Sequence, residues 1–170
     1  MDLIESLQED HREALRRLDG IEPAFTGALD DQGRVVPDAV ASVERQWNWF
    51  RTDLLVHFRR EEEALFPAAG DLREIMEGPV AQMRAEHREF EDLRAQIVGA
   101  LDTIRHGCCG KDEGAARLRR AGAGLCALLR EHIWKEDNIL FPMLRRDLPP
   151  DRLEEAGVRA ESIVLAGSAA

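Results

Sequence analysis

The chain has 170 residues, of which 44% are hydrophobic and 33% are charged, and its formal net charge is −10. This length suits one domain with a sizeable core, and the composition is ordinary for a soluble, helix-rich protein. The acidic balance argues against a nucleic-acid partner, which usually meets a basic face. No apolar run approaches the length of a membrane span and the N-terminus lacks the basic start of a secretion signal, so we expect a cytoplasmic protein without a membrane partner.

Four long segments carry apolar residues at three- and four-residue steps, which is the pattern of a helix with one buried face. In chain order they cover residues 2–28, 37–67, 79–106 and 111–145. The connections between them are short, and glycine or proline stands near most of the predicted helix ends. The sequence therefore predicts an all-α fold in which residues 1–146 form an antiparallel, up-and-down four-helix bundle.

The segments outside these helices are simpler. Residues 71–77 are expected to form a short helical turn, and residues 147–170 a C-terminal tail with a short helix near 151–156. The last long connection contains Cys108 and Cys109 between two glycines. Three cysteines do not describe a disulfide framework, so we interpret this loop as a linker with incidental thiols. A redox or metal-relay loop is the alternative.

One short pattern, His-x-x-x-Glu followed by Leu-Phe-Pro, occurs twice, once from His57 to Pro67 and once from His132 to Pro142. A histidine and a glutamate four residues apart lie on one face of a helix, one turn from each other. A further histidine precedes each copy, by 46 residues in the first half and by 45 in the second, so the chain reads as an internal duplication. The polar residues shared by the two halves are His11, His57, Glu61, His87, His132 and Glu136.

These six residues favour a metal centre over a set of unrelated core residues. A single histidine on an apolar face is more often a hydrogen-bonded core residue, and a single glutamate is usually solvated. Here each long helix places one histidine in its apolar stripe, and two helices add a glutamate. Buried carboxylates are costly unless they are paired or coordinated, so we expect Glu61 and Glu136 to stay unneutralised and destabilising without metal. Nitrogen and oxygen ligands without cysteine suit iron, manganese or zinc.

Six ligands exceed the needs of one tetrahedral zinc ion, so two ions fit the set better. Glu61 and Glu136 can bridge the two ions, and two histidines complete each one. A bridging oxo or hydroxo group would leave one open position on each ion for O2, NO or peroxide. Asp53, one turn before His57, could orient that imidazole by a hydrogen bond, although a solvated surface role is an equal alternative.

The paired motifs resemble the hemerythrin-like HHE cation-binding family over residues 1–146. The resemblance implies an antiparallel four-helix bundle around a non-haem di-iron centre, with zinc or manganese as substitute metals. Carried over by position, the implied roles are two terminal pairs and one bridging pair: His11 with His57 on one iron, His87 with His132 on the other, and Glu61 with Glu136 between them.

Oxygen-carrying hemerythrins have a further histidine on the third ligand helix, whereas here Met83 and Glu91 stand one turn either side of His87. The six-ligand set is closer to the iron-binding half of repair-of-iron-centres proteins, so we do not expect reversible O2 transport. The leading hypothesis is a di-iron protein that reacts with or senses a small diatomic or peroxide ligand, in a stress response or in iron-centre repair. A non-catalytic metal-binding, iron-storage or regulatory module is the alternative, and a helical bundle without metal is a third. The sequence shows no separate nucleophile or acid–base pair, so catalytic turnover would have to come from the open positions on the metals, and whether the protein is an enzyme stays open.

Overall fold

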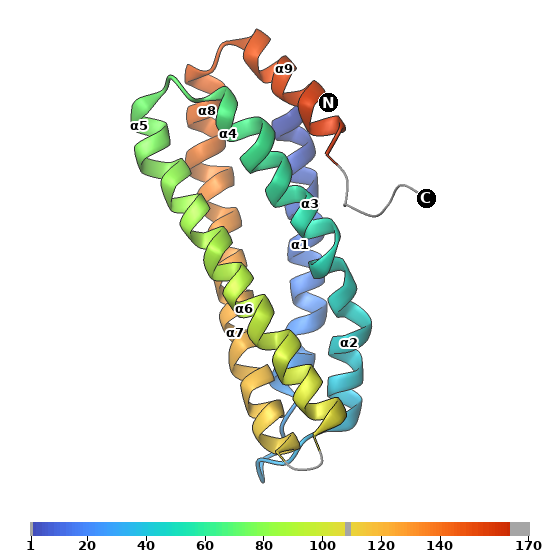
Figure 1. The fold of residues 1–170 in the computed structure, drawn as a ribbon. Helices are drawn as coiled ribbons and strands as arrows, with labels where there is room; N and C mark the ends of the chain where they lie inside the picture. Colours follow the sequence, from blue (N-terminus) through green and yellow to red (C-terminus); the bar gives the residue numbers. More distant parts are fainter. Residues whose placement is uncertain (1, 108–109, 164–170) are drawn as a thin grey trace. The chain divides into compact units, whose positions relative to one another are not determined.

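Helices make up the regular structure of the chain (Figure 1), which confirms the all-α prediction. The computed structural model describes residues 2–107 and 110–163, where the one β-type contact is an isolated bridge between Leu29 and Val35. No helix in these ranges is long and apolar enough to cross a membrane. The elements are α1 (Leu3–Thr26), α2 (Pro37–Arg51), α3 (Asp53–Arg60), η1 (Glu61–Leu65), α4 (Phe66–Ala68), α5 (Arg73–Ile75), η2 (Met76–Val80), α6 (Ala81–His106), α7 (Lys111–Lys135), η3 (Glu136–Leu140), α8 (Phe141–Asp147) and α9 (Pro150–Glu161), where η marks a π-helical turn.

The long helical segments predicted from the sequence are all present, but three of them are divided. The segment predicted over 79–106 begins in η2 and continues as α6. The segment predicted over 37–67 comprises α2, α3, η1 and α4, and Thr52 is its one residue outside a helix. The segment predicted over 111–145 comprises α7, η3 and α8. The π-helical turns η1 and η3 begin at Glu61 and Glu136, the two glutamates of the repeated motif.

The C-terminal segment differs from the prediction. Helix α9 continues to Glu161, five residues beyond the expected end at 156. Its buried residues are small, Ala156 and Ala160, and such residues give a weak apolar pattern in the sequence. They are buried because α9 packs against η1 and α4, which Figure 1 shows at the same end of the chain's first helix. Tertiary packing extends the helix where the sequence pattern is weak.

Contacts divide the chain into two units. The first unit contains residues 1–14, 49–87 and 131–170, and the second contains residues 15–48 and 88–130. All six polar residues of the repeated motif belong to the first unit. The candidate site can therefore be described within one unit.

The second unit contains a close approach between α1 and α7. A Cβ atom added at Gly122 would overlap the ring of Phe25, so only glycine fits at this position. Phe25 is buried and meets Trp47 edge to face, with ring centroids 6.3 Å apart. Arg130 of α7 donates to Asp19 at 2.9 Å, which joins the same two helices by a polar contact.

Candidate metal centre

Each glutamate of the repeated motif begins a π-helical turn. The N–H of the residue that follows each turn, Phe66 or Phe141, donates to the carbonyl of that glutamate five residues earlier. Proline comes next in both copies; it has no N–H, and its ring would collide with the carbonyl four residues back in a regular α-helix. The wider turn accommodates the proline, so the Leu-Phe-Pro sequence accounts for the position of the turn. Single π-helical turns occur often at functional sites.

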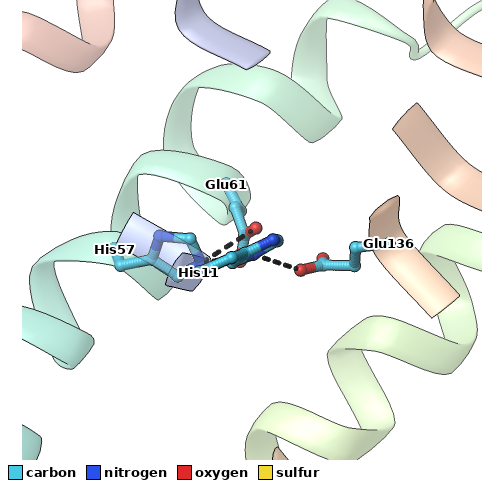
Figure 2. A group of neighbouring side chains, drawn as sticks. All are labelled: His11, His57, Glu61 and Glu136. Carbon is cyan, nitrogen blue, oxygen red and sulfur yellow. Dashed lines mark hydrogen bonds and ion pairs between the residues drawn. The ribbon is translucent and has the colours of Figure 1, made fainter. Parts of the chain in front are cut away.

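The six polar side chains come together in the interior of the first unit. None of them is more than 5% exposed. They form two overlapping groups, and the ligand atoms of each group lie within 4.8 Å of one another. The first group is His11, His57, Glu61 and Glu136, which converge in Figure 2, and the second is Glu61, His87, His132 and Glu136.

Glu61 and Glu136 belong to both groups. Each of them faces one histidine of the pair His11 and His57 and one histidine of the pair His87 and His132. This is the placement that a bridging carboxylate requires. The four nitrogen–oxygen distances are 3.3 Å from Glu61 Oε1 to His57 Nε2, 3.3 Å from Glu61 Oε2 to His87 Nε2, 3.1 Å from Glu136 Oε2 to His11 Nε2 and 3.4 Å from Glu136 Oε2 to His132 Nε2.

Several of these buried atoms have no hydrogen-bond partner among the described residues. They are both carboxylate oxygens of Glu61 and of Glu136, and the Nε2 atoms of His87 and His132. A buried polar atom without a partner costs about 1–3 kcal/mol, and more when it is charged. Coordinated cations would remove this cost, because carboxylate oxygens and imidazole nitrogens are ligands of iron, manganese and zinc. The residues present therefore fit the metal that the sequence predicts.

In the absence of metal, protonated histidines offset the glutamate charge. Burial lowers the pKa of His57, but the carboxylates of Glu61 and Asp10 outweigh it and raise this pKa to about 10. The pKa values of His11 and His87 are also raised, because neighbouring carboxylates outweigh burial. Burial raises the pKa of Glu61, but His57 and His87 hold it well below its usual range. The histidines are therefore a source of positive charge beside Glu61 that the sequence-based expectation did not include.

The second ring nitrogen of every histidine in the site faces a carboxylate, a feature that the sequence analysis missed. Asp10 and Glu86, which directly precede His11 and His87, each bond the second histidine of their own half. Glu62 and Asp137, which directly follow Glu61 and Glu136, each bond the first histidine of the other half. Bonds of this kind fix the tautomer and the orientation of a histidine ligand. These outer carboxylates, with their distances to Nδ1, are Asp10 to His57 at 3.2 Å, Glu86 to His132 at 2.9 Å, Glu62 to His87 at 2.7 Å and Asp137 to His11 at 2.9 Å.

Asp53 does not orient His57. Its side chain is exposed and accepts a hydrogen bond from Thr52 Oγ1 at 2.6 Å. The Nδ1 atom of His57 instead meets Asp10, which comes from α1. The sequence argument placed the partner on the same helix, whereas the fold supplies it from a helix distant in the sequence.

A cation lies behind one outer carboxylate of each half. Arg60 donates to Asp10 Oδ2 at 2.9 Å, and Lys135 donates to Glu86 Oε1 at 2.6 Å. Both cations directly precede the glutamate of their half. Burial raises the pKa of Glu86, but its bonds from His132 and Lys135 outweigh burial and lower this pKa to about 2. Glu86 is therefore ionised and accepts the Nδ1–H of its histidine.

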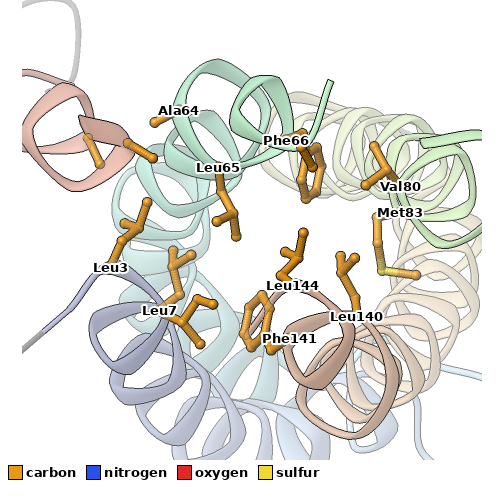
Figure 3. Close-up of a cluster of buried hydrophobic side chains, with 14 of the residues drawn as sticks. Leu3, Leu7, Ala64, Leu65, Phe66, Val80, Met83, Leu140, Phe141 and Leu144 are labelled. Atoms are coloured by element: carbon orange, nitrogen blue, oxygen red, sulfur yellow. The ribbon is translucent and has the colours of Figure 1, made fainter. Parts of the chain in front are cut away.

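An apolar cluster lies beside the site in the first unit (Figure 3). Phe141 stacks on His11 with ring centroids 5.5 Å apart, and Phe66 stacks on His87 at 6.2 Å. Both phenylalanines come from the Leu-Phe-Pro sequences, and each meets a histidine of the other half. An apolar shell of this kind limits the access of water to a metal site. The labelled side chains in Figure 3 are Leu3, Leu7, Ala64, Leu65, Phe66, Val80, Met83, Leu140, Phe141 and Leu144.

Glu91 and Cys126 are not members of the two ligand groups. Glu91 pairs with Arg94 at 2.7 Å and its side chain is 44% exposed. Cys126 is buried, and burial raises the pKa of its thiol to about 12, so it behaves as a small apolar residue. Cys108 and Cys109 lie outside the described residues, so neither interpretation of their loop is tested.

Comparison with known proteins agrees with this geometry. The family model of the hemerythrin HHE cation-binding domain matches residues 2–144. No match is found among curated proteins. The matched range contains the six polar residues, the four outer carboxylates and both Leu-Phe-Pro sequences, and it ends before α9. Because the match covers most of its length, the chain belongs to the hemerythrin HHE cation-binding domain family.

Proposed function

We propose that this protein is a non-haem di-iron protein that reacts with, or senses, a small oxidant such as O2, NO or peroxide. The proposed roles follow the two ligand groups: each histidine pair holds one iron, and both glutamates bridge. We further propose that the long helices form an antiparallel four-helix bundle, the arrangement in which facing helices build such sites. Zinc and manganese would fit the same nitrogen and oxygen ligands.

The charge around the site is the observation that carries this proposal. The two inner glutamates and the four outer carboxylates are opposed by Arg60 and Lys135, which leaves a net charge of −4. The histidines add no charge, since a metal-bound imidazole is neutral on its inner nitrogen. Two divalent cations balance this charge, whereas one would leave half of it unbalanced around the two fully buried glutamates.

The chain's own residues would contribute positioning and exclusion of water. The outer carboxylates orient the imidazoles, and the bridging carboxylates set the spacing of the metals. The bound metals supply redox chemistry and Lewis acidity. Phe141 on His11 and Phe66 on His87 place apolar rings directly against the imidazoles, a setting that suits a small diatomic or peroxide ligand. Stress response or iron-centre repair would both use such a reaction.

The first test is elemental analysis of protein produced in iron-replete cells and kept from chelators. We expect two metal ions per chain, mainly iron. The control is Glu63→Gln, a variant of an exposed neighbouring residue, which should have the same metal content. One ion or none per chain would contradict the proposal.

The second test separates reaction from storage. Reduced, anaerobic protein is mixed rapidly with O2, NO or hydrogen peroxide, and the optical spectrum is followed. A reactive or sensing centre should change with at least one of them much faster than the spectrum changes in buffer alone. A storage or regulatory module, the alternative function, predicts bound iron without such a response.

A further inference from the structure

The two histidine pairs differ in the state of their inner nitrogens. Within the first pair, His11 Nε2 and His57 Nε2 are hydrogen-bonded to each other at 3.2 Å. Within the second pair, the Nε2 atoms of His87 and His132 have no hydrogen-bond partner among the described residues. The Nε2 atoms of both pairs lie 3.1–3.4 Å from an oxygen of Glu61 or Glu136, so the contact between the two rings is what distinguishes the first pair. A cation entering the first pair must also separate these two rings.

The outer carboxylates of the two pairs are also different. The first pair is held by two aspartates, at 2.9 Å and 3.2 Å, and the second by two glutamates, at 2.7 Å and 2.9 Å. Shorter bonds to a carboxylate orient an imidazole more firmly and make it a stronger donor. By this measure the second pair is the better prepared of the two.

The contrast is clearest between Asp10 and Glu86. A single oxygen of Asp10, Oδ2, accepts from both His57 and Arg60, and the side chain is 37% exposed. Glu86 is 5% exposed and uses separate oxygens, Oε2 for His132 and Oε1 for the lysine behind it. The bond that holds His132 is thus unshared and protected from water.

A third difference comes from the residue after each motif histidine. Phe58 follows His57 and stacks on His87 with ring centroids 4.1 Å apart, and it meets His132 edge to face at 5.6 Å. The corresponding residue in the other half is Ile133, which has no aromatic ring. Phe58 therefore restricts the rings of the second pair.

We infer that the two metal positions fill in order. The His87–His132 position binds first and tightly, and the His11–His57 position binds second and exchanges its metal. This inference rests on the proposed two-metal function. Binding at the second pair requires less ordering of side chains, because its imidazole rings are held by shorter bonds to their outer carboxylates and by Phe58, and are not hydrogen-bonded to each other. The exchangeable position is the one that would accept or release iron.

The test uses cobalt(II), whose optical bands report its ligands, added to metal-free full-length protein. Titration followed by calorimetry and absorbance should resolve two steps, the first at least about tenfold tighter. Crystals grown with one equivalent should show anomalous scattering from cobalt between His87 and His132. Loss of an outer partner typically costs about 10–100-fold in metal affinity. Glu86→Gln should therefore weaken the first step, and Asp10→Asn the second step alone.

Glu63→Gln serves as the matched control and should leave both steps unchanged, since Glu63 is exposed and pairs with Arg59. Circular dichroism of each variant checks that the helices are retained. Two equivalents bound in one step, or a first cobalt at the His11–His57 position, would overturn the order while leaving the two-metal site intact. Saturation below two equivalents would instead overturn the two-metal site.

Discussion

The hydrogen bond made by Nδ1 of each histidine in the site fixes the orientation of Nε2, the nitrogen that faces the two glutamates. Each Nδ1–H donates to a carboxylate, so when the imidazole is neutral its lone pair lies on Nε2, which faces the centre of the site. The four carboxylates occupy matching places in the two halves, directly before a histidine or directly after a glutamate. Their places could have been noticed in the sequence, because Asp10 and Glu86 precede equivalent histidines. Their partners could not, since those lie on other helices.

The first prediction, at the scale of the residue, tests the proposal that Glu61 and Glu136 bridge the two metals. Glu61→Ala or Glu136→Ala should leave well under one metal ion per chain, because each glutamate is proposed to bind both ions. His11→Ala should retain about one ion, because it removes a ligand from one position only. Metal content after gel filtration distinguishes the two classes. Equal losses from the glutamate and histidine variants would remove the support for bridging.

The second prediction is the pH dependence of metal-free protein. The pKa of His57 is raised from 6.5 to about 10, so its contribution to stability is complete below about pH 6.5 and disappears as pH rises towards 10. The pKa of Glu61 is lowered, so its contribution is complete above about pH 4.5 and is lost as pH falls. Urea unfolding should therefore give the greatest stability between these limits.

The same unfolding series on His57→Gln supplies the control. This variant should lose much of the decrease in stability between neutral and alkaline pH, because the titrating imidazole is gone. A metal-free wild-type protein that became more stable as pH rose from about 6.5 to 10 would contradict the assignment of His57 as a protonated partner of Glu61.

At the scale of the element, the π-helical turns η1 and η3 explain how the repeated motif positions its glutamates. Each turn starts at a glutamate and ends before Phe-Pro, so proline and ligand occur at a fixed separation. The sequence analysis found the spacing but not its cause. Hydrophobic periodicity reports which face is buried and cannot distinguish one widened turn from a regular one. The hydrogen bond from Phe66 or Phe141 to a carbonyl five residues back makes the distinction.

The third prediction tests the close approach of helices in the second unit. Gly122→Ala should destabilise the protein by about 1–3 kcal/mol, because the new methyl group would overlap the Phe25 ring. Gly99→Ala is the matched control, since Gly99 lies in α6 with open space around its Cβ position. That change should stabilise by about 0.5–1 kcal/mol through helix propensity. Thermal unfolding measures both, and effects of the same sign would refute the packing argument.

At the scale of the whole molecule, the family match and the site coincide, but α9 adds to them. The match ends at residue 144, whereas the apolar cluster beside the site includes Ala156, Ala160 and Ile163. Helix α9 therefore supplies part of the core on which η1 rests. Its removal would expose the outer side of the turn that begins at Glu61.

The fourth prediction links metal to the stability of the molecule. An ion that binds the folded state alone stabilises it by about 2.7 kcal/mol at a concentration of 100 times its Kd. Metal-loaded protein should therefore melt clearly above metal-free protein in differential scanning calorimetry. The double variant Glu61→Ala/Glu136→Ala should show no such shift on adding metal. Equal melting temperatures of loaded and metal-free wild type would mean that the fold gains nothing from the site.

The sequence by itself determined the helical class, the approximate limits of the long helices and the six polar residues that the structure brings together. These features are local, because a helix of 3.6 residues per turn converts spacing along the chain directly into position on a face. The duplicated motif added a second, independent indication at His87 and His132. That the six residues bind metal stays a prediction.

Only the tertiary structure decided which groups meet across helices. The partners of the histidines, the stacking of Phe58 on His87 and the burial of α9 depend on contacts between residues far apart in the chain. The difference between the two histidine pairs involves residues that differ between the halves, such as Asp10 and Glu86, but which histidine each of them meets is decided by the packing of the helices. Spacing along one helix cannot reveal which side chain of another helix approaches it, because that depends on how helices pack.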